Sequence, residues 1–327
     1  MKGMSLFTTN EWMLLLSARF VNVLLGALMA WVVLKAAKLL FPRRYAWMFT
    51  ALVVFLPGNV ILYSYVNCDA LAMCSTAIIF YSWVKAYKEG WNWTTCAVSA
   101  IGMGLCFLSY YNAYGFILTT FFFFVGTMLT DQEKAPKERW KEMIQKGLFI
   151  LVIVCVIALW WFIRNAILYH GDFLGRETSS ACAELYARAK YKPSNSKTFQ
   201  KKGDSMLCMI FYRPVYLEHD WLVTVLYSFV GAFGYNRIYL SKMIIVPYLC
   251  CLGIGLILMR NCCQRDFFFW NADGTQTAIA GKTKRKWSKT GWFTWANVFA
   301  LLIPNYLNAY YSYSSDFQPQ DDTACRC

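Results

Sequence analysis

The stretch MLLLSARFVNVLLGALMAWVVL, residues 13–34, is a predominantly apolar run, and Lys35, Lys38, Arg43 and Arg44 follow it closely. A helix of this length crosses a hydrocarbon layer of about 30 Å. Basic residues just after such a helix are typical of its cytoplasmic end. The stretch therefore predicts a membrane-spanning helix that starts outside the cytoplasm.

Further apolar runs along the chain indicate more spans. They cover residues 46–66, 71–84, 93–110, 116–129, 147–163, 243–259 and 292–311. Each predicted return to the cytoplasmic side meets Lys or Arg, most densely in KTKRKWSK at residues 282–289. We therefore expect an all-α, polytopic transmembrane helix bundle of about eight spans with both termini outside. Pro57-Gly58 is expected to break the second span.

The composition supports this class of protein. Hydrophobic residues make up 58% of the 327-residue chain and charged residues only 15%, which is too apolar for a soluble domain of this size. The net charge of +14 sits in short clusters between apolar runs, so it indicates membrane orientation and not a nucleic-acid partner. The expected location is the plasma membrane, and membrane lipid is an expected partner.

One long polar passage, residues 164–240, interrupts the apolar runs and predicts a working surface outside the bilayer. It divides the chain into a transmembrane bundle (1–163), an extracytoplasmic loop region with interfacial helices (164–240) and a transmembrane pair with a basic loop and an external tail (241–327). Residues 180–191 are expected to be helical, and the apolar residues 221–235 to lie in the interface or dip back. Cys182 and Cys208 are positioned to pair if this region faces an oxidising space.

Asp69 lies beside Asn67 at the predicted outer mouth of a hairpin, and a carboxylate at that depth is costly unless it binds something. One interpretation is a ligand for a divalent cation or a contact to a phosphate-bearing donor. The other is a helix cap for the residues from Leu71 onward, because Asp is a preferred cap. The spacing favours neither interpretation.

Several cations and polar residues are candidates for binding a lipid-linked phosphate or a sugar. Arg19, near the outer end of the first span with Asn22 on the same face, either clamps a phosphate or snorkels to the headgroups. Arg164 opens the polar passage, ahead of His170, Asp172 and Arg176. Arg237 follows the Gly-rich turn GAFGYNR. The alternative is that these loop residues are solvent-exposed polar groups that bind no ligand.

Other kinds of chemistry are excluded by missing motifs. The chain has no Gly-rich phosphate loop, no dinucleotide-binding fingerprint and no HExxH. Its two histidines, His170 and His219, do not lie in a nucleophile motif. Reactions driven by ATP or by a soluble cofactor are therefore not expected.

Five stretches in fixed order resemble the GT-C superfamily of multi-pass glycosyltransferases, including the bacterial polyprenyl-phosphate-sugar-dependent enzymes and related membrane families of unknown function. They are ARFVNVLLGAL (18–28), FLPGNVILYSYVNCDAL (55–71), WWFIRNAILYHGDFLG (160–175), SFVGAFGY (228–235) and YYSYSSDFQPQ (310–320).

The resemblance implies transfer of a sugar from a polyprenyl-phosphate-linked donor to an extracytoplasmic glycan, lipid or protein acceptor, with Mg or Mn as a potential cofactor. It aligns Asp69 with the acid of the second external loop and makes Arg19, Arg164 and Arg237 candidates for the donor phosphate. It adds a set of candidates for contacts to the acceptor or donor. They are Asp172, Asp316, Gln318 and Gln320.

The chain departs from the family pattern at both ends, and we expect it to be shortened there. In the family a helix and an acid-bearing loop precede the stretch at residues 18–28, so the catalytic base is expected in an absent segment and this chain can be inactive. After QPQ, the loss of one G from the coding sequence would turn the family continuation Gly-Arg-Tyr-x-Leu-Pro into residues 321–327.

Two other functions stay open as alternatives. A transporter or flippase for lipid-linked sugars needs polar residues at mid-membrane in several spans, and these are scarce. A non-catalytic membrane scaffold in surface-glycan assembly is favoured if the external acids can be changed without effect.

Overall fold

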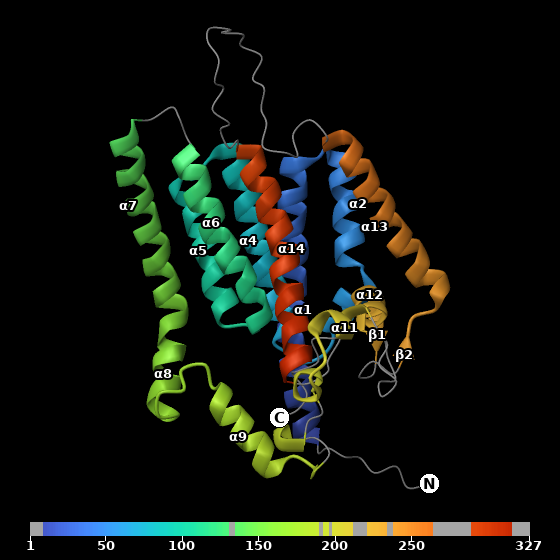
Figure 1. Ribbon diagram of the computed structural model, residues 1–327. Coiled ribbons are helices and arrows are strands. Elements are labelled where there is room, and N and C mark those ends of the chain that lie inside the picture. Colours follow the sequence, from blue (N-terminus) through green and yellow to red (C-terminus); the bar gives the residue numbers. More distant parts are fainter. Residues whose placement is uncertain are drawn as a thin grey trace.

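The computed structural model describes residues 9–130, 135–189, 192–195, 198–211, 221–233, 238–263 and 289–315, and in these ranges the chain is mainly helical (Figure 1). The long helices are α1 (Thr9–Leu40), α2 (Arg43–Val54), α4 (Asp69–Glu89), α5 (Trp93–Phe107), α6 (Tyr114–Thr130), α7 (Pro136–Val154), α13 (Lys242–Cys263) and α14 (Lys289–Ser314). The shorter elements are α3 (Pro57–Leu62), η1 (Tyr111–Ala113), η2 (Cys155–Leu159), α8 (Trp160–Leu168), α9 (Arg176–Tyr186), η4 (Pro193–Asn195), α10 (Phe199–Lys202), α11 (Met206–Phe211), α12 (Trp221–Gly231), β1 (Ala232–Phe233) and β2 (Ile238–Tyr239).

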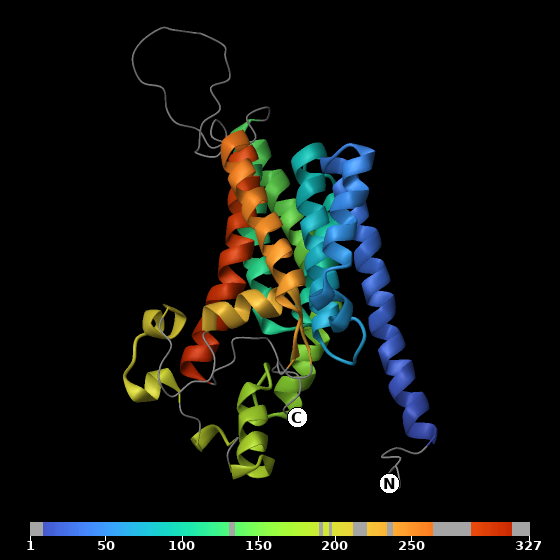
Figure 2. The ribbon, with the colours of Figure 1, turned by 90° about the vertical axis from the view of Figure 1, so that its right-hand side faces the viewer.

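Successive long helices run in opposite directions, so their ends gather at two ends of one bundle (Figures 1 and 2). The last turns of α1, α4 and α6 and the first turns of α2, α7 and α14 share the upper end in Figure 1. We call this the basic end because it carries a set of cations. They are Lys35, Lys38, Arg43, Arg44, Lys85, Lys88, Lys137, Arg139, Lys141, Lys146 and Lys289. We call the other end the loop end, since residues 63–68 and the elements α9 to α12 lie there.

The helices confirm the all-α bundle. Four helical segments in the described ranges are long and apolar enough to cross a membrane: Glu11–Leu40, Asp69–Glu89, Tyr111–Thr130 and Pro136–Leu168. Helices also occur at the other predicted spans, but the predicted total of eight crossings stays a prediction. The expected break in the second span is present, because α2 ends at Val54 and α3 starts at Pro57, which has no N–H to continue a helix.

The main core lies between α4, α5, α6, α7 and α14. α4 packs against α1 on one side and α5 on the other, and α6 packs against α14. Trp83, Trp91 and Phe123 are buried at the centre of this core. A second cluster, which includes Met29 and Ile78, fills the contact between α1 and α4. α4 is therefore the central helix, and it carries Asp69 at its first position.

A π-helical turn, η2, joins α7 to α8 so that residues 136–168 form one continuous helical segment (Figure 1). Ile157 in this turn packs against Gly104 of α5, where an added Cβ would come within 2.9 Å of the isoleucine side chain. Only glycine accommodates this approach without a shift of the neighbour. The widened turn is thus packed against the bundle, and the helix continues through it.

The loop region attaches to the end of α14. Phe199, Met209 and Trp221 are buried with Ala309 of α14 in a third cluster. α12 lies across the bundle axis in both views and ends at Gly231 (Figures 1 and 2). Its predicted place in the membrane interface stays a prediction. The short strands β1 and β2 pair antiparallel directly after it.

Two sequence expectations for the loop region need correction. The helix predicted over residues 180–191 is α9, which starts at Arg176 and ends at Tyr186. The predicted pairing of Cys182 with Cys208 is wrong in this structure, because both are free thiols.

Candidate functional site

Asp69 lies at the loop end as the first residue of α4, and only 8% of it is exposed. Its neighbour Asn67 supplies a capping bond, because the Asn67 Oδ1 accepts from the Ala70 N–H at 2.9 Å. The Asn67 Nδ2 donates to the Leu62 carbonyl at 2.8 Å. The cap interpretation of Asp69 is therefore wrong: the acid lies inside the first turn, where the helix dipole stabilises a negative charge.

Asn22 of α1 holds the loop that leads to Asp69. The Asn22 Nδ2 donates to the Tyr65 carbonyl at 2.5 Å and to the Asn67 carbonyl at 3.3 Å, and Asn22 is 6% exposed. Gly26, one turn further along α1, lies so close to Tyr63 that an added Cβ would be 2.8 Å from its ring. The first helix thus fixes residues 63–68 through the hydrogen bonds of Asn22 and the close contact of Gly26 with Tyr63.

The structure separates Arg19 from Asn22, although the sequence places both on one face of α1. Asn22 points inward to the loop, whereas Arg19 is exposed. This position matches the snorkelling alternative better than a phosphate clamp preformed beside Asp69.

Tyr111, in η1, links the region of Asp69 to the turn before α9. The Tyr111 hydroxyl donates to the Leu174 carbonyl at 2.7 Å. The same hydroxyl lies within electrostatic reach of Arg176, Asp172 and Cys68, the residue before Asp69. Three segments that are distant in the sequence therefore meet at the loop end. Sequence analysis missed Tyr111, because nothing marks the turn YYNAY apart from its aromatic content.

Asp172 organises the start of α9. Its two carboxylate oxygens accept from the backbone N–H groups of Arg176 at 3.1 Å and Thr178 at 2.9 Å. These bonds, chiefly the one from Thr178, lower the pKa of Asp172 below its usual range. Asp172 thus serves as a helix cap, and it fixes Arg176 at the first position of α9.

The turn before Asp172 has an unusual backbone. His170 has φ 52° and is followed by Gly171 with φ 101°; among the described residues, His170 is the one non-glycine residue with positive φ. Such conformations cost about 1–3 kcal/mol and persist where the surrounding structure requires them. The strained turn directs the chain from α8 back toward Tyr111.

Arg164 is bound to its own helix. Its guanidinium lies 5.1 Å from the centroid of the Trp161 ring and donates to the Asn165 Oδ1 at 3.2 Å. Asn165 is buried and donates in turn to the Phe173 carbonyl at 3.4 Å. Arg164 itself is exposed, so the structure does not place it against Asp69.

The remaining candidates lie outside the described residues. They are Arg237, Asp316, Gln318 and Gln320. Within the described ranges, no three His, Cys, Asp or Glu side chains come together as a metal site. Among the described residues, Asp69 is the acid in the first turn of α4, and a cation bound to it there would take further oxygen ligands from a bound phosphate and from water.

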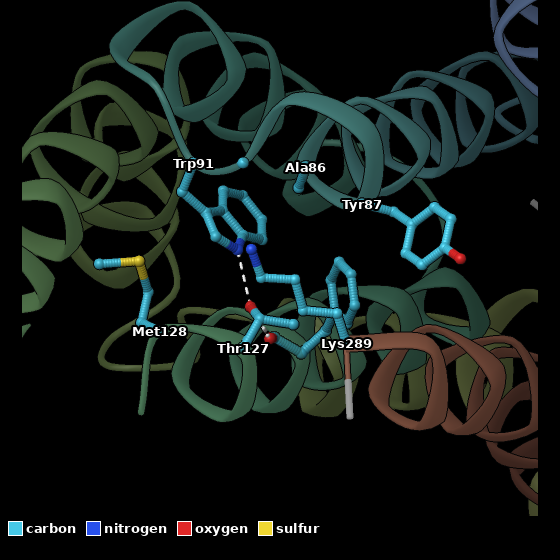
Figure 3. A pocket seen from close by; sticks show the side chains of 8 residues that line it. Ala86, Tyr87, Trp91, Thr127, Met128 and Lys289 are labelled. Atoms are coloured by element: carbon cyan, nitrogen blue, oxygen red, sulfur yellow. Dashed lines mark hydrogen bonds between the residues drawn. The ribbon is translucent and has the colours of Figure 1, made fainter. Parts of the chain in front are cut away.

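A small pocket lies at the basic end and is separate from this region. It has a volume of about 30 Å³ and lies between the ends of α4 and α6 and the start of α14 (Figure 3). Tyr87, Trp91 and Lys289 line it, and the Trp91 indole donates to the Thr127 hydroxyl at 2.8 Å. This volume suits about one or two water molecules and not a sugar. The candidate site is the loop end, where Asp69 starts α4 and Tyr111 bonds the turn before Arg176.

Comparison with known families agrees with the helix bundle. Residues 2–161 match the family described as dolichyl-phosphate-mannose-protein mannosyltransferase. The chain is GT-C-like. This GT-C match includes α1, Asp69 and Tyr111 and ends before Arg164. It supports a membrane glycosyltransferase of the GT-C type, for which membrane lipid and a lipid-linked sugar donor are the partners. No curated protein and no solved structure matched the chain.

Proposed function

We propose that this GT-C-like protein transfers a sugar from a polyprenyl-phosphate-linked donor to an acceptor on the extracytoplasmic side of the plasma membrane. The observation that carries the proposal is the position of Asp69, a buried acid at the start of α4. Asn22 fixes the loop before it, and the preceding residue, Cys68, lies within electrostatic reach of the Tyr111 hydroxyl. Mannose is the first sugar to test, because the matched family is described by that donor.

The orientation of the bundle supports this placement. The cations of the basic end support its placement on the cytoplasmic side, because Lys and Arg are enriched in cytoplasmic loops. The loop end then faces the extracytoplasmic space, where lipid-linked sugars and surface acceptors meet.

The proposed reaction is a direct displacement. An acceptor hydroxyl attacks the anomeric carbon, the bond from that carbon to the phosphate oxygen breaks, and polyprenyl phosphate leaves with the bonding electrons. A carboxylate takes the acceptor proton, and a cation of the protein stabilises the phosphate charge. We assign this second role to Arg176, which is exposed at the first position of α9 and lies within electrostatic reach of the Tyr111 hydroxyl.

Asp69 has two potential roles in this scheme. It either takes the acceptor proton itself or, if a base lies in a segment outside this chain, binds the donor head through a Mg or Mn ion. The described residues do not form a metal site of their own, so a metal ion in this second role would depend on ligands from the donor as well as on Asp69. Addition of a chelator before the assay tests the second role.

The experiment that tests the proposal compares Asp69→Asn with wild type in proteoliposomes. The substrate is polyprenyl-phosphate mannose labelled in the sugar, a simple alcohol is added as acceptor, and the readout is transfer of the label from the lipid phase to the water-soluble glycoside. We expect a loss of at least about 100-fold, as is typical for removal of a catalytic acid or base. Glu138→Gln, on α7 at the basic end, is the matched control and should retain full rate.

Two results would contradict the proposal. An unchanged rate in Asp69→Asn would assign Asp69 a purely structural role. Failure of the wild-type chain to act on any member of a panel of polyprenyl-phosphate sugars would favour the scaffold alternative.

A further inference from the structure

The corner between α1 and α2 at the basic end combines exposed cations with exposed aromatic rings. The Lys35 Nζ lies 5.1 Å from the centroid of the Trp31 ring, and the Lys38 Nζ lies 5.6 Å from that of Trp47. The second pair joins the two helices. We define the α1–α2 corner by the side chains of these pairs and of the two arginines that start α2. They are Trp31, Lys35, Lys38, Arg43, Arg44 and Trp47.

The charge of this corner is not compensated by nearby acids along the chain. No Asp or Glu occurs between Glu11 and Asp69, and Asp69 lies at the loop end. The ion pairs found among the described residues, Lys85–Glu89 and Lys146–Glu142, belong to α4 and α7. All four cations of the corner are exposed. The corner therefore presents a compact positive surface.

The rings place this surface at the depth of the lipid headgroups. Trp31 and Trp47 are 56% and 52% exposed, and indole rings at helix ends settle in the membrane interface. A lysine held over such a ring is oriented before a ligand arrives. A third pair of the same kind occurs at this end, where the Lys88 Nζ lies 5.7 Å from the Tyr87 ring centroid.

We propose that the α1–α2 corner is a binding surface for the headgroups of anionic phospholipids. Lys35 and Lys38 would contact the phosphate as point charges, and Arg43 and Arg44 would donate paired hydrogen bonds to its oxygens. The rings lie alongside the glycerol and upper acyl region. Clusters of Lys and Arg next to a transmembrane helix bind anionic lipids through the same forces. This inference does not depend on the proposed reaction at the loop end.

The test uses the purified full chain in nanodiscs of neutral phosphatidylcholine that contain a small fraction of phosphatidylglycerol. Native mass spectrometry after release from the nanodisc reports which lipids stay bound. Because a nanodisc exposes both ends of the protein to both lipids, orientation in the cell does not affect the result. We expect wild type to retain phosphatidylglycerol above its share in the disc.

Charge-matched variants locate the surface. Lys38→Gln with Arg43→Gln should lower retention of phosphatidylglycerol on the order of tenfold. Lys137→Gln with Lys141→Gln removes two exposed charges from α7 at the same end and should leave retention unchanged. Lys38→Arg with Arg43→Lys keeps the charge and should retain most of the binding.

Other outcomes would overturn the proposal. Equal retention of both lipids by wild type would show that the corner does not select anionic headgroups. An equal loss in the α1–α2 and α7 variants would show that the attraction comes from the net charge of the basic end and not from this corner. Thermal unfolding of each variant in detergent confirms that binding is compared between folded proteins.

Discussion

The indole N–H of Trp83 in α4 donates to the hydroxyl of Thr120 in α6 at 3.0 Å, across 37 residues of sequence. The Thr120 hydroxyl in turn donates to the Phe116 carbonyl at 2.6 Å, one turn back in its own helix. Both residues are buried, so the bond satisfies the one polar atom of a large ring inside an apolar core.

Two more tryptophans donate their indole N–H groups to threonine hydroxyls of α6. Trp91 donates to Thr127 at 2.8 Å, and Trp292 of α14 donates to Thr130 at 2.9 Å. Each threonine also donates to a carbonyl of the preceding turn. α6 thus forms directed contacts with α4, with the turn after α4 and with α14. Such bonds fix rotation and depth of neighbouring helices, which apolar contacts in lipid do not do.

Replacement of Thr127 by Val should destabilise the bundle. Valine keeps the shape but removes the acceptor of Trp91, whose buried N–H is then left unpaired at a cost of about 1–3 kcal/mol. The free energy of unfolding in mixed micelles measures this loss. Thr127→Ser keeps the hydroxyl and should recover most of it. Equal losses in both variants would show that the missing methyl group, and not the hydrogen bond, matters.

Gly126→Ala should disturb the contact between α6 and α14. An added Cβ at Gly126 would lie 2.5 Å from the Trp292 ring, so the ring and its helix must move. Overpacking of this kind costs about 1–3 kcal/mol. Gly253→Ala in α13 is the matched control, since nothing lies within 4 Å of its added Cβ. We expect a lower unfolding midpoint for Gly126→Ala and an unchanged or higher one for Gly253→Ala.

Asn22→Leu should loosen the loop that leads to Asp69. Leucine has similar size but cannot donate to the carbonyls of Tyr65 and Asn67. A loss of about 1 kcal/mol in loop stability raises the open population roughly fivefold. Cys68 is exposed in this loop, and its rate of maleimide labelling, resolved by peptide mass spectrometry, reports the opening. Ser17→Ala on the same helix should leave the rate unchanged. An unchanged rate in Asn22→Leu would contradict the anchoring role.

Protonation of Asp172 at low pH should destabilise the first turn of α9. The pKa of Asp172 is lowered in the folded protein, mainly by the Thr178 N–H, so the contribution of the carboxylate to stability is complete above its unfolded value of about 3.9. This contribution is lost as the pH falls through the folded pKa. Hydrogen exchange at residues 176–180, corrected for intrinsic rates, should accelerate over that range. In Asp172→Asn the corrected exchange rate should not depend on pH in this range. If wild type and Asp172→Asn show the same pH profile, Asp172 does not stabilise the first turn of α9 through its charge.

Sequence patterns predicted the bundle because hydropathy and basic flanks depend only on local composition. The break at Pro57 followed from the same kind of local rule. The contacts of Trp83, Trp91 and Trp292 with threonines of α6 were not predictable, because each joins residues at least 36 positions apart. Their partners depend on the rotation of each helix, which a short apolar pattern leaves open.

The candidate site was predicted in part. Asp69 and Asn67 were identified at the correct loop, but the capping role belongs to Asn67, because the helix starts one residue earlier than a cap at Asp69 requires. Helical spacing placed Asn22 and Arg19 on the same face of the first helix. In the structure Asn22 binds the loop before Asp69, whereas Arg19 is exposed. Tyr111 has no sequence signal, since its importance comes from a bond to Leu174 in a distant turn.

Because η2 is a π-helical turn, residues 136–168 can lose one residue there without a change in the orientation of the helix faces on either side. One residue more than a regular α-helix needs is absorbed between Cys155 and Leu159, so α7 keeps its contact with α5 while Asn165 of α8 still faces inward. We expect that deletion of one residue in this turn would convert it to regular helix and leave both faces where they are. A deletion elsewhere in residues 136–168 would rotate everything beyond it by about 100°, and the strained turn at His170 would then lead away from Tyr111.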